Sequence, residues 1–189
     1  MDEMITAMLR YGNLNVQQTD LIKSRFTETT LKKGAYFSEA EKIANRVGFV
    51  NEGVMRVCYY NNKGEDITRC FIPHNRFVGD MNSFYNQIAT SEYVEALTDC
   101  SLLIIDREDF NDLAATIISW NDIFTRITSS SLMRKVQEKN VMIAQDATER
   151  YLGFLKDYPG MANRVPLSAL ASYLGITQSS LSRIRKSLS

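Results

Sequence analysis

The chain divides into three stretches that differ in the spacing of their apolar residues. Residues 4–27 show helical spacing, on one face through Ile5, Met8 and Leu9 and on another through Leu21, Ile22 and Phe26. Between Leu31 and Asp106 the spacing changes to short β-rich runs, which glycines and Pro73 interrupt. From Arg107 onward the helical spacing returns. This order predicts an α+β chain whose N-terminal part contains an antiparallel, jelly-roll-like β-roll.

The β-rich stretch contains four clear runs, which read RVGFVNEGVMRVCYY, DITRCFIP, EYVEAL and SLLIID. Many short strands at close spacing are typical of a roll or barrel. Between the first two runs stands the segment NNKG, in which Gly64 is expected to take the positive φ of a hairpin turn.

A long helix is predicted after the roll. A short helix over REDFNDLAATI comes first, and Ser119 then offers an N-cap, with Asp122 three residues later. The helix continues to about Ala144, with apolar positions at Trp120, Ile123, Phe124, Ile127, Leu132, Val136 and Ile143. Its length of roughly 37 Å exceeds what a small roll needs on one face. A partner chain is expected to cover the surplus apolar stripe, as in a coiled coil. The alternative is a helix that lies wholly against its own domain.

The C-terminal part begins with a second capping pattern, formed by Asp146 and Glu149. An apolar helical face follows and ends at Pro159-Gly160; its expected members are Tyr151, Leu152, Leu155 and Tyr158. The sequence therefore predicts three regions: a β-roll domain over 1–118, a long dimerisation helix over 119–145 and a helical domain over 146–189.

The final segment predicts two helices joined by a tight turn. One helix face is formed by Leu167, Leu170, Ala171 and Leu174, and Gly175 follows at once, where a left-handed conformation ends a helix. Thr177 is expected to cap the next helix, whose buried face is Leu181, Ile184 and Leu188. Two helices at this spacing are typical of a helix-turn-helix.

The second of these helices has the chemistry of a DNA-reading helix. Gln178 can pair with adenine edges and Arg183 with guanine or phosphate, while Arg185 and Lys186 can neutralise phosphates. The residues predicted to face double-stranded DNA are Thr177, Gln178, Ser179, Ser180, Ser182, Arg183, Arg185 and Lys186. A helical hairpin packed on a domain needs Leu and Ala at the same spacing, but it needs no exposed basic face.

Composition adds a charge asymmetry and excludes several classes. The formal net charge is zero, yet residues 150–189 hold six of the 22 basic residues and one of the 22 acidic residues. This suggests a polyanionic partner for one end, although a solvated charged tail gives the same count. The three cysteines are far apart and are expected to be buried thiols. No apolar run spans a bilayer, the N-terminus lacks a signal-peptide pattern, and no catalytic motif is present, so a cytoplasmic non-enzyme is expected.

The segment LSALASYLGITQSSLSRIRKSL resembles the helix-turn-helix of the Crp/Fnr superfamily of bacterial transcription regulators. The upstream sequence is similar to that family's cyclic-nucleotide-binding-type roll: Gly53 and Arg56 match its G-x-x-R/K pattern, and FVGDMNSF with TSEYVEAL stands at its phosphate-binding cassette. The resemblance implies a homodimer that binds DNA, contacts RNA polymerase and carries an effector pocket. The pocket residues it implies are Gly79, Asp80, Met81, Asn82, Thr90 and Ser91.

The sequence departs from the family where a cyclic phosphate would bind. Thr90 stands at the position of the phosphate-pairing arginine, and Asp80 replaces a glutamate. A buried phosphate needs a matched charge, which threonine does not supply. We therefore expect little or no binding of cyclic AMP, and either another small-molecule effector, which includes an uncharged one, or none. No cofactor or metal is expected: His74 stands alone, and the acidic run from Asp106 to Asp112 is expected to mark a helix N-terminus.

Two functions from different classes remain open at this stage. The first is a homodimeric DNA-binding transcription regulator. The second is a ligand-sensing or protein-docking module whose C-terminal helices bind a protein partner. Binding to DNA weakens steeply as the salt concentration rises, which separates the two.

Overall fold

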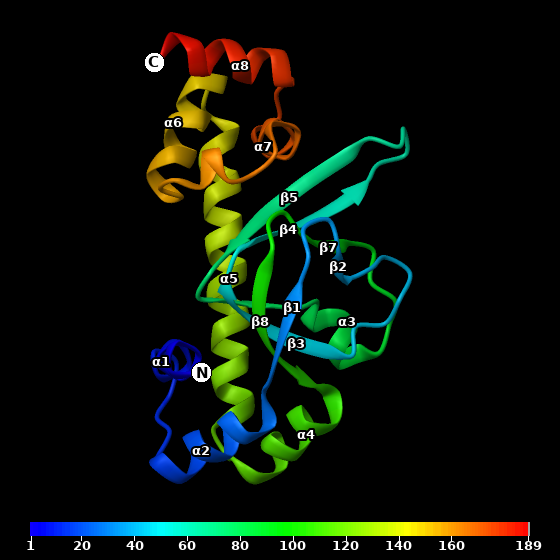
Figure 1. Ribbon diagram of the computed structural model, residues 1–189, viewed down its shortest axis with the longest axis vertical. Helices are drawn as coiled ribbons and strands as arrows, with labels where there is room; N and C mark the ends of the chain where they lie inside the picture. Colours follow the sequence, from blue (N-terminus) through cyan, green and yellow to red (C-terminus); the bar gives the residue numbers. More distant parts are fainter. Residues whose placement is uncertain (189) are drawn as a thin grey trace.

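The computed structural model describes residues 1–188 and shows a β-roll, a long helix along one side of it, and a helical C-terminal region at one end of that helix (Figure 1). The predicted α+β fold is thus confirmed. Ser189, the last residue of the predicted C-terminal domain, lies outside the described residues. The predicted domain limits themselves stay predictions.

The roll is built from two four-stranded antiparallel sheets. The first sheet has the order β1 (Thr27–Leu31), β8 (Cys100–Asp106), β3 (Arg46–Glu52) and β6 (Arg76–Val78). The second has the order β2 (Tyr36–Ser38), β7 (Tyr93–Ala96), β4 (Val54–Tyr60) and β5 (Asp66–Pro73). Apolar side chains from both sheets meet between them, among them Phe37, Val50, Met55, Cys70 and Leu102.

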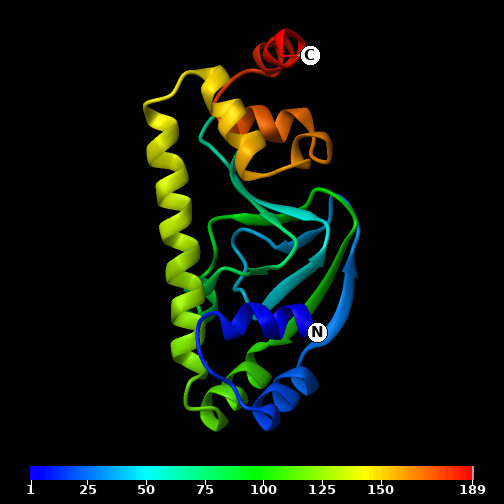
Figure 2. The ribbon, with the colours of Figure 1, turned by 90° about the vertical axis from the view of Figure 1, so that its left-hand side faces the viewer.

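Helices flank the roll on several sides. Those of the N-terminal three quarters are α1 (Asp2–Leu9), α2 (Val16–Arg25), α3 (Met81–Asn86), α4 (Arg107–Thr116) and the long α5 (Trp120–Ile143). The C-terminal region contains α6 (Ala147–Asp157), a 3-10 turn (Met161–Asn163), α7 (Leu167–Leu174) and α8 (Gln178–Ser187). Seen from the side, α5 runs past the roll and reaches the C-terminal helices (Figure 2).

Local sequence explains the two turns that shape β4. Gly64 has the expected positive φ of 75° in the hairpin between β4 and β5, where the Asn61 side chain accepts hydrogen bonds from the N–H groups of Lys63 and Glu65. Gly53, between β3 and β4, has φ of 99°, and a Cβ there would lie 2.5 Å from the Cys100 Sγ. Both positions therefore favour glycine.

Arg56 of β4 is a buried cross-strand tie. Its guanidinium lies 2.6 Å from carboxylate oxygens of Asp66 and Glu95 and donates to the Thr68 hydroxyl at 2.9 Å. Burial alone would lower the pKa of Arg56, but the hydrogen bonds to the two carboxylates raise it, so the charge is retained. Arg56 thus joins β4, β5 and β7, and it does not line the cavity described below.

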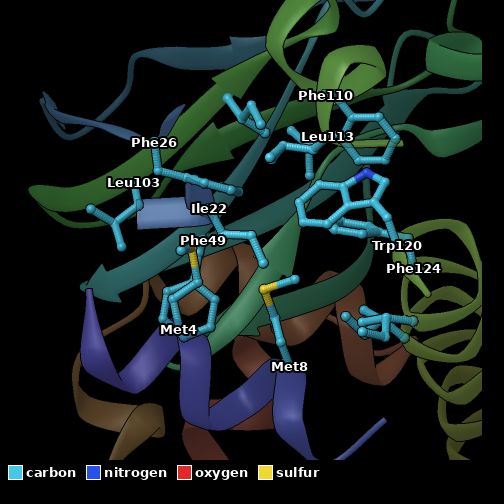
Figure 3. Close-up of a cluster of buried hydrophobic side chains, with 14 of the residues drawn as sticks. Met4, Met8, Ile22, Phe26, Phe49, Leu103, Phe110, Leu113, Trp120 and Phe124 are labelled. Atoms are coloured by element: carbon cyan, nitrogen blue, oxygen red, sulfur yellow. The ribbon is translucent and has the colours of Figure 1, made fainter. Parts of the chain in front are cut away.

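The largest core cluster lies where the N-terminal helices, the first sheet and the start of α5 meet (Figure 3). Trp120 and Phe124 of α5 pack against Phe110 of α4, with ring centroids 5.2 and 4.8 Å apart. Met4 and Met8 of α1 close the cluster and are fully buried. The start of α5 is therefore held inside the roll domain by aromatic packing.

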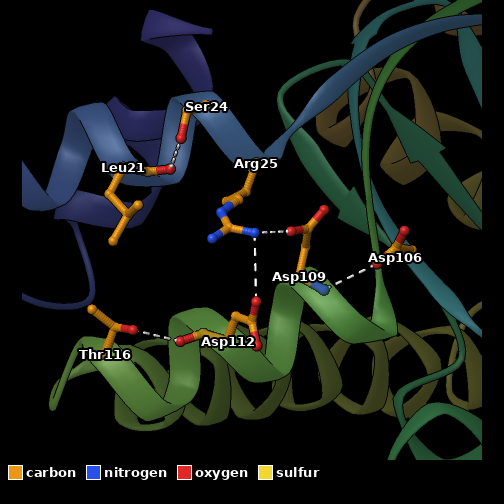
Figure 4. Close-up of polar contacts among 7 residues, drawn as sticks. All are labelled: Leu21, Ser24, Arg25, Asp106, Asp109, Asp112 and Thr116. Atoms are coloured by element: carbon orange, nitrogen blue, oxygen red, sulfur yellow. Dashed lines mark hydrogen bonds and ion pairs between the residues drawn. The ribbon is translucent and has the colours of Figure 1, made fainter.

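The acidic run forms a helix start, as predicted, and also an ion pair (Figure 4). The Asp106 carboxylate caps α4 by accepting from the Asp109 N–H at 3.0 Å. Arg25, at the end of α2, pairs with Asp109 and lies 3.5 Å from Asp112. These carboxylates join two helices beneath the first sheet.

The predicted N-cap of α5 is wrong in its chemistry. Ser119 precedes the helix, but its side chain makes no capping hydrogen bond. Its φ and ψ of −81° and −4° are already helical, because the Trp120 N–H bonds the Ile117 carbonyl in a tight turn. A capping side chain needs an extended backbone, which this turn does not allow.

The C-terminal region packs on the second sheet through aromatic residues. Phe154 of α6 and Tyr173 of α7 contact Phe71 of β5 at 5.6 and 5.1 Å between ring centroids. The prediction for α6 is wrong at one position, because it places Leu152 on the buried face and omits Phe154. Phe154 is buried together with Tyr151 and Tyr158, whereas Leu152 is 46% exposed. The sheet provides an aromatic partner on that side, which helical spacing alone does not reveal.

A hydroxyl on α7 completes the edge of the second sheet. The Ser172 Oγ accepts from the Thr68 N–H at 2.9 Å and donates to the Asp66 carbonyl at 3.0 Å. Because β5 is an edge strand, these two groups would otherwise point to solvent. Ser172 thus fixes the position of α7 along β5.

Two other expectations meet the structure directly. Cys58, Cys70 and Cys100 are buried free thiols, as predicted, and burial raises the pKa of Cys58 to about 11. Along residues 1–188, none of the helices combines the length with the apolar composition that a membrane span requires.

Two isoleucines five positions apart, Ile118 and Ile123, test the anchoring of α5. Ile123 is fully buried, whereas Ile118 is fully exposed. We expect Ile123→Ala to lower the free energy of unfolding by about 2–5 kcal/mol, because it leaves a cavity. Ile118→Ala should change it by less than about 0.5 kcal/mol. Urea unfolding followed by circular dichroism measures both, and equal effects would contradict this placement of α5.

Candidate DNA-binding surface and effector cavity

The last two helices form the predicted bent pair. Leu170, Ala171 and Leu174 of α7 are buried, and Gly175 ends the helix with φ of 67°. The Gly175 N–H bonds the Ser172 carbonyl, and Arg150 of α6 donates to the Leu174 carbonyl at 2.7 Å. These bonds satisfy carbonyl groups at the C-terminal end of α7, and the chain turns into α8 as predicted.

Thr177 caps α8 as predicted. Its hydroxyl accepts from the Ser180 N–H at 3.1 Å, and its backbone is extended. Leu181 is fully buried against the rest of the region and Ile184 is half-buried. Leu188 is 49% exposed, so the predicted apolar face of α8 ends one turn earlier than expected.

Most residues predicted to face DNA lie together on the outer side of α8. Gln178 and Ser179 are exposed in its first turn, and Ser182, Arg183 and Lys186 follow on the same side. The Arg183 Nε donates to the Ser179 carbonyl at 3.4 Å, so this side chain lies along its own helix. Thr177 is also exposed, and Ser180 is half-buried. The surface formed by Thr177, Gln178, Ser179, Ser182, Arg183 and Lys186 is called the α8 outer face below.

Arg185 is placed differently from the other predicted DNA contacts. Its Nη2 donates to the Ala162 carbonyl at 2.5 Å and its Nε to the Tyr151 hydroxyl at 3.1 Å. Its guanidinium also lies 5.9 Å from the centre of the Tyr151 ring. The side chain therefore ties α8 to α6, and the sequence offered no signal for this, because the carbonyl lies 23 positions away.

The second predicted site is a cavity of about 250 Å³ between the roll and α5. Of the residues expected in an effector pocket, Gly79, Asp80, Met81, Asn82 and Thr90 line this cavity, while Ser91 is exposed and does not belong to the lining. The cavity wall is mainly apolar, with side chains such as Val57, Ile72, Phe77, Phe124 and Ile127.

The polar side chains at the cassette are already engaged. Asp80 caps α3 by accepting from the Ser83 N–H at 3.0 Å. Thr90 is buried, and its hydroxyl accepts from the Glu92 N–H at 3.2 Å. Glu92 is ion-paired with Arg69. Position 90 therefore provides no positive charge for a phosphate.

Sequence reasoning missed the cations that reach the cavity from other elements. The cavity is lined by four of them: Arg69 of β5, Arg76 of β6, and Arg134 and Lys135 of α5. A signal for the last two existed: Phe124, Ile127 and Ser131 share a helical face that extends to Lys135. The arginines of β5 and β6 carry no such pattern, because their placement depends on how the two sheets close.

Comparisons with known proteins agree with this architecture. Residues 28–116 match the family model of the cyclic nucleotide-binding domain. A sequence search of curated proteins gives no significant match. Among solved structures, FixK2 from Bradyrhizobium japonicum has a TM-score of 0.75 and 18% identity, and the match covers 86% of this chain and 84% of that one.

Two further structures extend the match toward the C-terminus. The c-di-GMP-responsive global regulator CLP of Xanthomonas campestris has a TM-score of 0.71 and 17% identity, over 92% of this chain and 91% of that one. A protein from Eubacterium rectale described as a transcriptional regulator of the Crp/Fnr family has a TM-score of 0.69 and 17% identity, over 90% and 82%. The chain therefore shares one fold with such regulators over most of its length.

Proposed function

We propose that this chain, whose residues 28–116 match the family model of the cyclic nucleotide-binding domain and whose fold is that of Crp/Fnr regulators, is a homodimeric transcription regulator that binds double-stranded DNA. One observation carries the proposal. The α8 outer face exposes short polar and basic side chains on a helix whose opposite side is buried on Leu181. A helix that served only to close a small domain would need no such face.

The side chains of this face suit a major groove. Gln178 and Ser179 stand in the first turn of α8, where recognition helices approach base edges. Arg183 reaches guanine or phosphate, and Lys186 neutralises phosphates. Arg185 acts differently in this proposal: it holds α8 on α6 and so sets the angle at which the helix meets DNA.

The second half of α5 suits a partner copy of the same chain. Met133, Val136 and Ile143 are 72%, 50% and 83% exposed. Together with exposed Asn140 they follow a spacing of three and four residues, which is that of a coiled-coil seam. A single polar residue in such a seam favours one register. Two copies joined there would present two α8 helices to successive major grooves.

The cavity next to α5 suits an effector other than cyclic AMP. Thr90 leaves the cassette without a cation, and its hydroxyl is occupied. The Xanthomonas neighbour responds to c-di-GMP, so this fold serves other effectors elsewhere. As in the family that the sequence resembles, we place the protein in the cytoplasm with RNA polymerase as a further partner.

Arg183→Ala tests the DNA-binding face. Binding sites are first selected from a random DNA pool with the full chain. We expect Arg183→Ala to weaken binding to a selected site by about 1–3 kcal/mol, since it removes one groove contact. Lys63→Ala, an exposed change at the β4–β5 hairpin tip, is the control and should bind like the wild type. Mobility shift measures both at several salt concentrations.

Two results would contradict DNA binding by α8: a wild-type affinity that does not change with salt concentration, or an Arg183→Ala variant that binds like the wild type. In that case the C-terminal helices serve a protein partner instead.

Val136→Glu tests the dimer. The wild type should sediment with twice the 21.6 kDa mass of the chain, and Val136→Glu should shift it toward the single mass, because a carboxylate enters the seam. Gln137→Glu adds the same charge on an exposed neighbour outside the seam and should leave the dimer intact. A monomeric wild type at tens of micromolar would rule out the proposed seam.

Calorimetry with cyclic AMP tests the interpretation of Thr90. We expect weak heat or none, because the cassette offers the phosphate no matched charge. A dissociation constant below about 1 µM, which corresponds to roughly 8 kcal/mol, would show that the other cations of the cavity replace the missing arginine.

A further inference from the structure

Two successive turns of α5 contact the cavity and the C-terminal helices. Arg134 and Lys135 line the cavity, whereas Glu138 and Lys139, on the next turn, bond Tyr158 at the end of α6 and Tyr173 of α7. Figure 2 shows how α5 passes the roll and continues to these helices. The short segment 134–139 therefore joins the cavity to the C-terminal helices through polar contacts.

Glu138 is held by donors from three elements. Its carboxylate accepts from the Tyr158 hydroxyl at 2.9 Å, from the Arg134 Nη1 at 3.1 Å and from the Tyr173 hydroxyl at 3.4 Å. Arg134 Nη1 also donates to the Tyr158 hydroxyl at 3.2 Å. These four residues are called the Glu138 latch below. The latch ties the C-terminal ends of α6 and α7 to α5.

Burial fixes the protonation of the latch. Burial raises the pKa of both Tyr158 and Tyr173, and the Glu138 charge raises them further. Both hydroxyls therefore stay protonated and donate to the carboxylate at any physiological pH. Arg134 is the one cation among the four, with a third of its side chain exposed, against 15% for Glu138. The charge balance of the latch depends on Arg134.

The cavity has an excess of positive charge on that side. The lining holds two acidic side chains: Glu92, which pairs with Arg69 of the same lining, and Asp80, which caps α3. Three further cations stand beside the apolar wall: Arg76, Lys135, and Arg134, which is bound to Glu138. A small molecule with an apolar body and one anionic group matches this lining, because the wall accepts the body and the cations beside it compensate the charge.

We propose that Arg134 couples the cavity to the DNA-binding region: an anionic group in the cavity competes with Glu138 for the Arg134 guanidinium and so loosens the Glu138 latch. The proposal rests on the proposed function, in which the cavity takes an effector and α8 reads DNA. Glu138 would keep its two tyrosine hydrogen bonds, so α6 and α7 are loosened and not released.

Linkage makes the coupling reciprocal. If an anion weakens the contact between Arg134 and Glu138, then the loss of the Glu138 charge must strengthen anion binding. Glu138 lies outside the cavity lining but binds Arg134 within it, so its replacement measures the competition for Arg134. Amide exchange in α6 and α7 then measures whether that competition reaches the C-terminal helices.

The full chain is titrated with anilinonaphthalene sulfonate, a fluorescent probe with an apolar body and one anionic group, and with its uncharged parent N-phenylnaphthylamine. The wild type should prefer the sulfonate. Glu138→Gln should raise the affinity for the sulfonate at least about fivefold, the lower limit of ordinary coupling, and leave the neutral probe unchanged. Arg134→Gln should abolish the preference. Arg126→Gln, on an exposed turn of the same helix, is the matched control.

Hydrogen exchange on the wild type gives a second measurement that needs no variant. The sulfonate should increase amide exchange in α6 and α7, and the neutral probe should not. The proposal is overturned if Glu138→Gln leaves the affinity for the sulfonate unchanged or changes the affinity for both probes equally. It is also overturned if the sulfonate does not change amide exchange in α6 and α7. No DNA is present in either experiment, so a failure of DNA binding would leave these results readable.

Discussion

The burial of Trp120, Ile123 and Phe124 in the roll fixes the direction of α5, and the placement of the rest follows from that direction. A helix of 24 residues behaves as a rigid rod, so an anchor at one end determines where the other end stands. The first half of the rod completes the roll core. The second half supplies a cavity wall, an exposed apolar seam and the docking point of the C-terminal helices.

The contacts at the two ends of α5 differ in kind. At its start the contacts are aromatic and buried, and such packing is non-directional and tolerates no exchange of partner. At its far end the contacts run through Glu138, Arg134 and two tyrosine hydroxyls, which are directional and can change partners. Ser172 of α7 adds a contact of the same kind at the edge of β5. The joint to the C-terminal helices thus combines these polar contacts with the aromatic packing of Phe154 and Tyr173 on Phe71, and the proposed ligand acts on the polar part.

The cations of the cavity do not come from the cassette. Thr90 stands where the family that the sequence resembles has an arginine, and its hydroxyl accepts a hydrogen bond within the local turn. The cations that line the cavity belong to β5, β6 and α5, each of which is separated from position 90 by at least one other element. An expectation drawn from the cassette alone therefore concerns position 90 and does not describe the charge of the whole cavity.

The sequence by itself determined the features whose causes lie within a few residues: the strand and helix periods, the Asp146–Glu149 capping box, the left-handed Gly175 and the Thr177 cap. These depend on local backbone geometry, which nearby side chains dictate. Only the tertiary structure decided that Ser119 does not cap α5, that Phe154 is the buried residue of α6, that Arg185 binds its own domain and that Arg134 is shared between two sites. Each depends on groups that meet only when separate elements pack, and spacing along the chain carries no record of such meetings.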